Sequence, residues 1–365
     1  MAEEKKQQLN QLRSRIDELD SQIIDKLNER LRVAIKIGRL KSGGKIPVFH
    51  PEREKQVISN IVGHNSGGVF PKNLLINIYT EIMSASRSLQ SPLRIAYLGP
   101  KATYTHMALC RHFGSAVEGI PVESIEETFR AVENGKTAYG VVPVENSTEG
   151  VVTHTLDRFV DSQLNIVSEI YMNISHCLLS RCTDIKAIGK IYSHPQSFSQ
   201  CRLWLNSNLS SVEKMETSSN SRAAEMAAEE ESAAAIAGKI AGGVYDLNIL
   251  ASHIEDNPEN MTRFLVIGKD LCKPTDRDKT SLVCSVKDRP GALHDLLSAF
   301  SSRNINMTRI ESRPTRKKAW QYLFFIDLEG HVEDPAIRQT LEELEETTQY
   351  IHVLGSYPVG STVFE

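Results

Sequence analysis

The first 90 residues contain cations and neutral donors at spacings that could place them around one small anion. Arg30 and Lys41 are 11 positions apart, which on an α-helix is about 20° of rotation and roughly 16 Å of rise, so both share one face. Ser86 and Gln90, four positions apart, form a second polar pair on one helical face. From composition alone these residues could equally belong to a solvated surface. If these residues instead form a site, they predict electrostatic binding of a small anionic ligand.

Arg13 lies too far from Arg30 to share a ligand with it on one straight helix. Their separation of 17 positions corresponds to about 100° of rotation and roughly 25 Å of rise. If both arginines serve one site, they come from two protomers.

Hydroxyl and amide side chains accompany the predicted strands in the middle of the chain. Asn146 and Ser147 follow YGVVPV, Ser193 and His194 end KIYSH, and Thr262 precedes RFLVIG. At strand ends and helix starts, such residues direct hydroxyl and backbone N–H groups at carboxylates. Taken alone, each is also an ordinary turn or helix-capping residue.

Three helices are predicted to position the N-terminal cations. Apolar residues at three-and-four spacing predict one long amphipathic helix over 7–42, which the stretch SGGKIP (42–47) ends. Pro51 and Pro71 are expected to open helices over 51–62 and 71–90. A helix of roughly 50 Å cannot bury its apolar stripe against two shorter ones, so we expect a homodimer or a higher homo-oligomer.

The pattern changes after Ser91-Pro92. Short apolar runs then alternate with helical stretches, which predicts an α/β domain over 92–270. Beyond the charged linker CKPTDRDKT (272–280), the order strand, helix, strand, strand, helix, strand predicts a ferredoxin-like α+β domain over 279–360. With the all-α domain at 1–91, we expect three domains.

Composition excludes several classes of protein. Residues 1–90 carry a net charge of +5 and the remainder −9, but the basic part has few aromatic residues for base stacking, so nucleic acid is not an expected partner. There is neither a membrane-length apolar run nor an apolar N-terminal signal, so a cytoplasmic location without membrane association is expected. The six cysteines show no zinc-like spacing, and neither a disulfide nor a bound metal is expected.

The segments LRSRIDELD, NER, GRLK, PERE and the closing SxxxQ resemble the all-helical chorismate mutases over residues 8–90. In that family a dicarboxylate rearranges without proton transfer, so the protein supplies positioned cations and donors. The resemblance implies that Lys41 and Gln90 are catalytic, at the ether oxygen, and that Glu54 and Ser86 hold the substrate hydroxyl and neighbouring groups. Arg13 of a partner chain, Arg30 and Arg53 would hold carboxylates. A frequent family aspartate is His50 here, which occupies a substrate-contact position.

Five segments resemble the prephenate dehydratases over residues 93–268: LGPKATYTHMAL, VPVENSTEG, YSHPQSFSQC, SSNSRAAEMA and IEDNPENMTRF. No G-x-G-x-x-G occurs, which disfavours the alternative fusion to a dehydrogenase. The resemblance implies two α/β lobes of the periplasmic-binding-protein type, with the site between them. Thr262 would assist loss of the ring hydroxyl, and substrate contacts would come from Asn146, Ser147, Ser193, His194, Gln196, Gln200 and Arg263.

The turns DRPGAL (288–293) and ESRPTR (311–316) resemble those of ACT-type regulatory domains, which bind phenylalanine at a domain interface. The implied effector contacts are Gly291, Ala292, Leu293, Glu311, Ser312, Arg313 and Pro314. Over nearly its full length the chain resembles bifunctional chorismate mutase/prephenate dehydratases. This implies conversion of chorismate to prephenate and then to phenylpyruvate in phenylalanine biosynthesis, with feedback inhibition by phenylalanine and no cofactor. A non-catalytic cytosolic sensor of aromatic ligands is the alternative.

Overall fold

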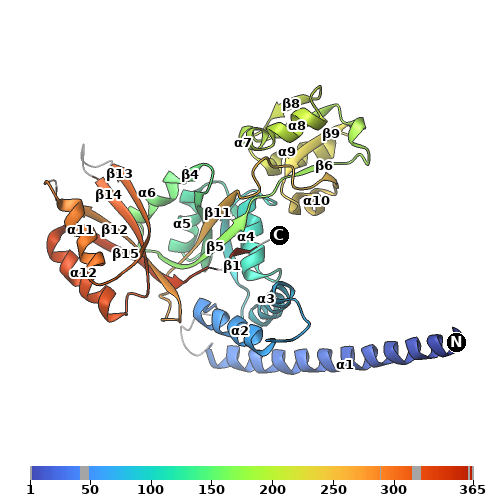
Figure 1. Ribbon diagram of the computed structural model, residues 1–365, viewed down its shortest axis with the longest axis horizontal. Coiled ribbons are helices and arrows are strands. Elements are labelled where there is room, and N and C mark those ends of the chain that lie inside the picture. The colour runs from blue at the N-terminus through green and yellow to red at the C-terminus, as the bar shows by residue number, and fades with distance from the viewer. Residues whose placement is uncertain (1, 42–48, 288, 315–321, 361, 364–365) are drawn as a thin grey trace.

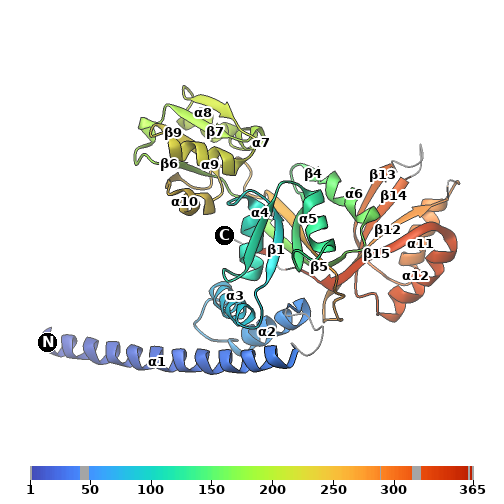
Figure 2. The same cartoon turned by 180° about the vertical axis from the view of Figure 1, so that it is seen from behind.

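The computed structural model describes residues 2–41, 49–287, 289–314, 322–360 and 362–363. A helical region, a two-lobed α/β region and a four-stranded plait follow one another along the chain and occupy separate places in space (Figures 1 and 2). The predicted break at 42–47 lies outside the described residues, as do Asp288, Thr315, Arg316, Trp320 and Gln321 of the predicted plait.

The helical region consists of α1 (Ala2–Lys41), α2 (Pro51–His64) and α3 (Lys72–Ser88). α1 is continuous over 40 residues because its sequence is free of proline and rich in Leu, Ile, Lys, Arg and Glu. Pro51 opens α2 as predicted. Pro71 is instead the extended cap residue before α3, one residue earlier than the helix itself. All three predicted helices are present.

The first lobe is a mixed sheet with strand order β16-β5-β11-β3-β1-β2. β1 (Arg94–Leu98) lies parallel between β2 (Glu118–Val122) and β3 (Tyr139–Asn146), and β4 (Gly150–Val151) folds back on β3. β11 (Met261–Gly268) is antiparallel to both β3 and β5 (Asn165–Asn173). The connecting helices are α4 (Tyr104–Phe113), α5 (Ile125–Glu133) and α6 (Thr153–Asp161). β3 and β11 are the central strands, and their apolar residues are buried on both faces.

The second lobe is a five-stranded sheet with order β10-β6-β9-β7-β8. Its strands are β6 (Cys177–Ser180), β7 (Lys190–Ser193), β8 (Glu213–Glu216), β9 (Ala233–Ala237) and β10 (Asn248–Ala251). Its helices are α7 (Pro195–Gln200), α8 (Arg202–Asn208), α9 (Asn220–Glu229) and α10 (Ile240–Tyr245), together with the short 3₁₀ turn Ile185–Ala187. The alanine-rich stretch forms α9 and the fully buried β9, as predicted. The chain enters this lobe after β5 and leaves it before β11, so two crossover segments join the lobes.

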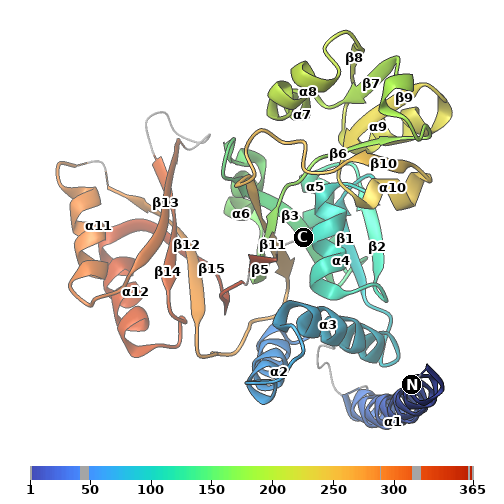
Figure 3. The same ribbon diagram turned by 45° about the vertical axis from the view of Figure 1, so that its right-hand side comes forward.

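The C-terminal region is the predicted plait, with strand order β13-β14-β12-β15. Its elements are β12 (Asp278–Val286), α11 (Ala292–Ser301), β13 (Met307–Pro314), β14 (Tyr322–Glu329), α12 (Pro335–Thr347) and β15 (Thr348–Pro358). β12 begins at Asp278, inside the stretch predicted as linker, because the Asp278 carboxylate accepts hydrogen bonds from Thr275 and the strand pairs with the end of β15. Both helices cover one face of the sheet (Figure 3).

The three regions are joined by buried contacts. Phe49, ahead of α2, is 2% exposed and packs its ring 4.8 Å from Phe113 of α4 and 5.2 Å from Tyr139 of β3. At the other end, β16 (Thr362–Val363) leaves the plait and adds a parallel edge strand to β5. The helical region and the plait therefore both dock on the first lobe. The second lobe is joined to the first by the two crossovers and by direct contacts, such as the hydrogen bond from the Ser221 hydroxyl to the Lys101 carbonyl.

Candidate functional sites in the helical, two-lobed and plait regions

The structure brings Arg30, Ser86 and Gln90 together where α1 crosses α3. The Arg30 guanidinium donates a 2.6 Å hydrogen bond to the Ser86 hydroxyl, and the Gln90 amide donates to the Ser86 carbonyl at 3.2 Å. Gly38 makes the crossing possible, because a Cβ there would lie 2.7 Å from Cγ of Gln90. Lys41 follows Gly38 by one helical turn, and burial lowers the pKa of its ammonium. Arg30 and Lys41 thus lie along one face of α1, and Ser86 and Gln90 lie where α3 and its C-terminal end contact that helix.

The predicted residues of α2 are more dispersed. Glu54 forms an ion pair with the buried Arg87 of α3, and 21% of the Glu54 side chain is exposed. Arg53 is exposed and donates to Gln56 at 2.6 Å, one turn further along α2. His50 lies 3.4 Å from the Glu52 carboxylate. Of these three predicted contacts, the structure connects only Glu54 with α3.

Figure 1 shows the N-terminal part of α1 extending away from the rest of the molecule. Arg13 belongs to the N-terminal half of this helix. Its neighbours Leu9, Leu12, Ile16, Leu19 and Ile23 are 42–61% exposed, so the apolar stripe of this helix is uncovered in the single chain. Arg13 is itself exposed and stands roughly 25 Å along the helix from Arg30, as expected from its position. Within one chain, the structure does not bring the two arginines together.

In the two-lobed region, Asn146 and Thr262 face each other on paired strands. They are register partners on β3 and β11, and the Asn146 amide donates to the Thr262 hydroxyl at 2.8 Å. The same amide donates to the Asn260 side-chain oxygen at 2.8 Å. The Asn146 oxygen accepts from the backbone N–H groups of Thr148 and Glu149, and Ser147 bonds across to the backbone of Glu259 and Met261. This network fixes both strand ends at the edge that faces the crossovers.

The second lobe contributes the start of α7. Ser193 is fully buried, and its hydroxyl donates to Asn220 at 3.5 Å, while the backbone N–H of His194 donates to the same oxygen at 3.2 Å. His194 caps α7 by accepting from the N–H of Gln196. Gln200, at the end of α7, reaches back to the first lobe with its amide 3.5 Å from the Glu149 carboxylate. Of the predicted second-lobe residues, Gln200 is therefore the one with a described contact to the first lobe, close to Asn146 and Ser147 in the sequence.

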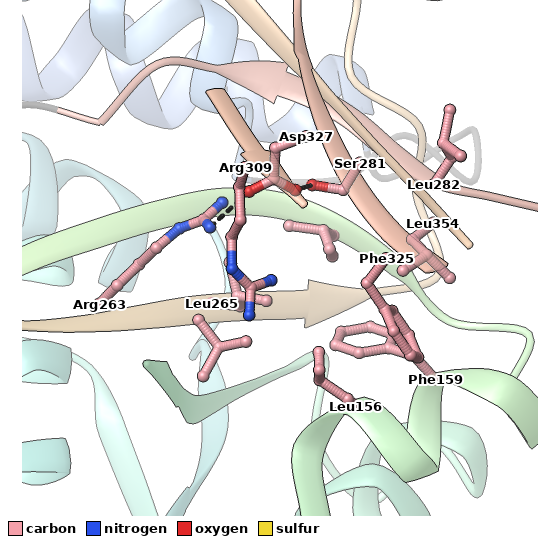
Figure 4. Close-up of a pocket in the computed structure, with 12 residues that line it drawn as sticks. Leu156, Phe159, Arg263, Leu265, Ser281, Leu282, Arg309, Phe325, Asp327 and Leu354 are labelled. Carbon is pink, nitrogen blue, oxygen red and sulfur yellow. Dashed lines mark hydrogen bonds and ion pairs between the residues drawn. The ribbon is translucent and has the colours of Figure 1, made fainter. Parts of the chain in front are cut away.

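Arg263 does not belong to this site, contrary to the sequence-based prediction. It follows Thr262 on β11, and adjacent strand residues point to opposite faces. Its guanidinium binds Glu169 at 2.9 Å, Asp327 at 2.5 Å and the Tyr357 hydroxyl at 3.0 Å. Figure 4 shows the contact with Asp327. The side chain is 6% exposed and all three nitrogens are engaged, so Arg263 joins the first lobe to the plait.

The interface around Arg263 holds further charged residues that the sequence analysis missed. Glu169 also accepts from Lys279 at 2.8 Å and from the backbone N–H of Gly360 at 3.0 Å. Arg309 of β13 pairs with Glu145, the residue before Asn146, at 3.0 Å. Glu145 and Arg263 are register partners and line the side of β3 and β11 opposite Asn146 and Thr262. Sequence alone contains no signal for these pairs, because their members come from separate domains.

The two predicted effector turns lie on the plait. Gly291 has a φ of +81° and caps α11, with no atom within 4 Å of a Cβ built on it. The requirement for glycine at this position is therefore the left-handed backbone. Ala292 is buried and Leu293 is 39% exposed.

On β13, Glu311 and Arg313 are partly buried, while Ser312 and Pro314 are exposed. Arg313 lies 3.3 Å from Asp157 of α6, so this strand also contacts the first lobe.

Over the described residues, no helix is long and apolar enough to cross a membrane. Three family models match the chain in order: chorismate mutase type II over residues 12–91, prephenate dehydratase over 95–271 and the ACT domain over 280–346.

A relative from Aquifex aeolicus, a bifunctional chorismate mutase/prephenate dehydratase, is 48% identical over 355 residues, which is 96% of this chain and 98% of the relative. A prephenate dehydratase from Arthrobacter aurescens, solved in complex with L-Phe, superposes with a TM-score of 0.68 at 34% identity, covering 73% of this chain and 90% of that one. The prephenate dehydratase of Staphylococcus aureus Mu50 gives a TM-score of 0.64 at 29% identity over 73% of this chain and all of that one. The chain thus consists of a chorismate mutase, a prephenate dehydratase and an ACT domain, and it belongs to the family of bifunctional chorismate mutase/prephenate dehydratases.

Proposed function

We propose that the helical domain converts chorismate to prephenate at the crossing of α1 and α3. The observation that carries this assignment is the Arg30–Ser86–Gln90 contact beside Lys41. Arg30 and Arg53 hold substrate carboxylates, and Glu54 and Ser86 hold the hydroxyl and neighbouring groups, with His50 at the rim. Lys41 and Gln90 donate to the ether oxygen, where negative charge grows as the carbon–oxygen bond breaks.

The mutase site is completed by a second copy of the chain. The uncovered apolar stripe of α1 offers a surface for that copy, and its Arg13 supplies the remaining carboxylate contact. A homodimer formed through α1 is therefore part of the proposal.

The prephenate dehydratase site lies between the two lobes. Thr262, held by Asn146, assists departure of the ring hydroxyl, which is coupled to loss of carbon dioxide and to formation of the aromatic ring. Ser147 of the first lobe and Ser193, His194 and Gln196 of the second orient the prephenate carboxylates directly or through backbone N–H groups. Gln200 also donates from the second lobe. The reaction yields phenylpyruvate.

Phenylalanine, a close analogue of that product, inhibits the enzyme through the ACT domain. The prephenate dehydratase solved in complex with L-Phe, which matches 73% of this chain, supports phenylalanine as a ligand. We assign the contacts to Gly291, Ala292 and Leu293 in one turn and to Glu311, Ser312, Arg313 and Pro314 on β13. The domain limits that go with these functions are 1–91, 92–270 and 279–360.

Adding chorismate to the purified full-length chain tests the assignment. We expect prephenate to accumulate first and phenylpyruvate to follow, and phenylalanine to slow the second step. A non-catalytic sensor would bind aromatic ligands and leave chorismate unchanged. Prephenate supplied directly then separates the dehydratase from the mutase.

A further inference from the structure

The crossover between the lobes contains a buried histidine that contacts both sides of the dehydratase site. His176, between β5 and β6, is 1% exposed. Its Nδ1 lies 2.8 Å from the hydroxyl of Tyr104, in the first turn of α4, and its Nε2 lies 2.8 Å from Oε1 of Gln200 in the second lobe. Gln200 in turn places its amide nitrogen toward Glu149, next to Asn146.

The backbone around His176 is held as firmly as its ring. Its N–H donates to the Glu255 carboxylate at 2.7 Å, and its carbonyl accepts from Ile254 at 3.1 Å, so the two crossovers are bonded to each other at this residue. The N–H of Asp256 donates to the Gln200 carbonyl at 2.7 Å. The imidazole and the Gln200 side chain therefore have little freedom to separate.

The orientation of the Gln200 amide favours one arrangement of protons along this chain of contacts, because its oxygen faces His176 and its nitrogen faces Glu149. Burial lowers the pKa of His176, which favours the neutral ring with one donor and one acceptor nitrogen. If Nε2 carries the proton, it donates to Gln200 Oε1 and the Gln200 amide nitrogen faces Glu149. Nδ1 is then an acceptor for the Tyr104 hydroxyl, whose proton has the Ser175 carbonyl at 2.9 Å as a second acceptor. The opposite tautomer requires a flipped Gln200 amide, whose oxygen would then face the Glu149 carboxylate and be repelled by it.

We propose that His176 is a positioning residue for the dehydratase, which fixes the Gln200 amide with its N–H₂ group directed at the substrate site. A dicarboxylate substrate needs donors, so a flipped amide would present the wrong group. This inference rests on the proposed dehydratase function and adds to it a residue that does not itself contact substrate.

Kinetics of His176 variants on prephenate test the inference in the full-length enzyme. His176→Asn retains a polar group near Tyr104 but is too short to reach Gln200, and we expect dehydratase kcat/KM to fall by about 10- to 100-fold, as for loss of other orienting partners. His176→Gln reaches the Nε2 position with an N–H donor and is expected to recover most of the loss. His253→Asn, in the other crossover, is the matched control, since His253 is 69% exposed and does not contact Gln200.

A double-mutant cycle with Gln200→Ala separates positioning from a general structural effect. If His176 acts through Gln200, adding His176→Asn to the Gln200→Ala variant should lower dehydratase kcat/KM by less than about 2-fold. Equal losses in both backgrounds, or wild-type kinetics of His176→Asn, would overturn the proposal. The mutase rate and the melting temperature of the same preparations report on folding. Absence of phenylpyruvate from the wild-type enzyme would instead refute the proposed function itself.

Discussion

Gln90 is the residue at which the mutase proposal can be tested most directly. Its amide is neutral and donates without first taking up a proton, so mutase activity should change little between about pH 6 and 8. Gln90→Glu must be protonated before it can donate, and we expect kcat/KM for chorismate to fall as the pH rises through that range. The two pH profiles, measured side by side, check the assignment, and parallel profiles would contradict it.

Lys41 supplies the charged donor beside Gln90. Lys41→Ala should lower the mutase kcat by about 10²–10³, the usual loss for one transition-state donor. Lys36→Ala is a suitable control, because Lys36 is an exposed lysine of the same helix. An unaffected kcat for Lys41→Ala would remove this residue from the site.

Thr262 tests the separation of the two activities at the level of one side chain. Its hydroxyl lies among Asn146 and Asn260 in the dehydratase lobes, and no described contact links it to the helical domain. Thr262→Ala should therefore reduce phenylpyruvate formation from prephenate by about 10² while chorismate is still consumed. Loss of both activities in a folded protein would show that the two sites are not independent.

At the scale of elements, α1 determines whether the mutase site is shared. Arg13→Ala and Arg30→Ala each remove one arginine from every site of a homodimer. A mixed dimer of the two inactive chains, however, contains one site with both arginines intact. After subunit exchange, verified by differently tagged chains, we expect up to about one quarter of wild-type mutase activity per mixed sample. Exchange without recovery would place both arginines in the same protomer or outside the site.

At the scale of the whole molecule, the buried charges around Arg263 hold the plait on the dehydratase lobe. Although burial opposes ionisation of Asp327, Arg263 and Ser281 outweigh it and hold the pKa of its carboxyl below the usual value. A depressed carboxyl pKa contributes stability above about pH 4 that is lost as the pH falls through the folded-state pKa. Asp327→Asn leaves Arg263 buried with one partner fewer, so we expect unfolding free energy to fall by about 3 kcal/mol near neutral pH.

Thermal or denaturant unfolding of Asp327→Asn measures that loss, with Glu329→Gln as the control, because Glu329 is exposed on the same strand. The difference from wild type should stay constant from neutral pH down to about pH 4 and shrink as the pH falls further, through the lowered folded-state pKa of Asp327. A difference that stays constant below about pH 4 as well would show that the ion pair does not account for it.

Phenylalanine inhibition is also a property of the whole molecule, because effector and substrate are proposed to bind in different domains. The contacts between these domains limit which variants can test it. Deleting the plait would strip Arg263 of Asp327 and Tyr357 and remove the edge strand β16, so loss of regulation could not be told from damage. Gly291→Val is unsuitable too, since φ at this position is +81°. Point variants at the exposed side chains are cleaner.

Leu293→Ala and Ser312→Ala should each raise the phenylalanine concentration for half-inhibition by about 10-fold, within a coupling of about 1–3 kcal/mol. Leu203→Ala, an exposed leucine of the second lobe, is the control. Unchanged inhibition in both effector variants would direct attention to the dehydratase cleft, where a product analogue could compete with prephenate.

The sequence by itself determined the order and type of the domains. The periodicity of α1, the change of pattern after Ser91 and the βαββαβ order of the plait are local properties, and local pattern specifies elements and their succession. The meeting of Ser86 with Gln90 was equally predictable, because residues four apart share a helical face.

Only the tertiary structure decided which side of a strand or which domain each polar residue serves. Thr262 and Arg263 are neighbours in one motif, yet alternation along β11 directs Thr262 to Asn146 and Arg263 to the plait. His176 carried no sequence signal, because Tyr104 and Gln200 lie 72 and 24 positions away. Pairings across such separations depend on how complete domains pack, which no local pattern encodes.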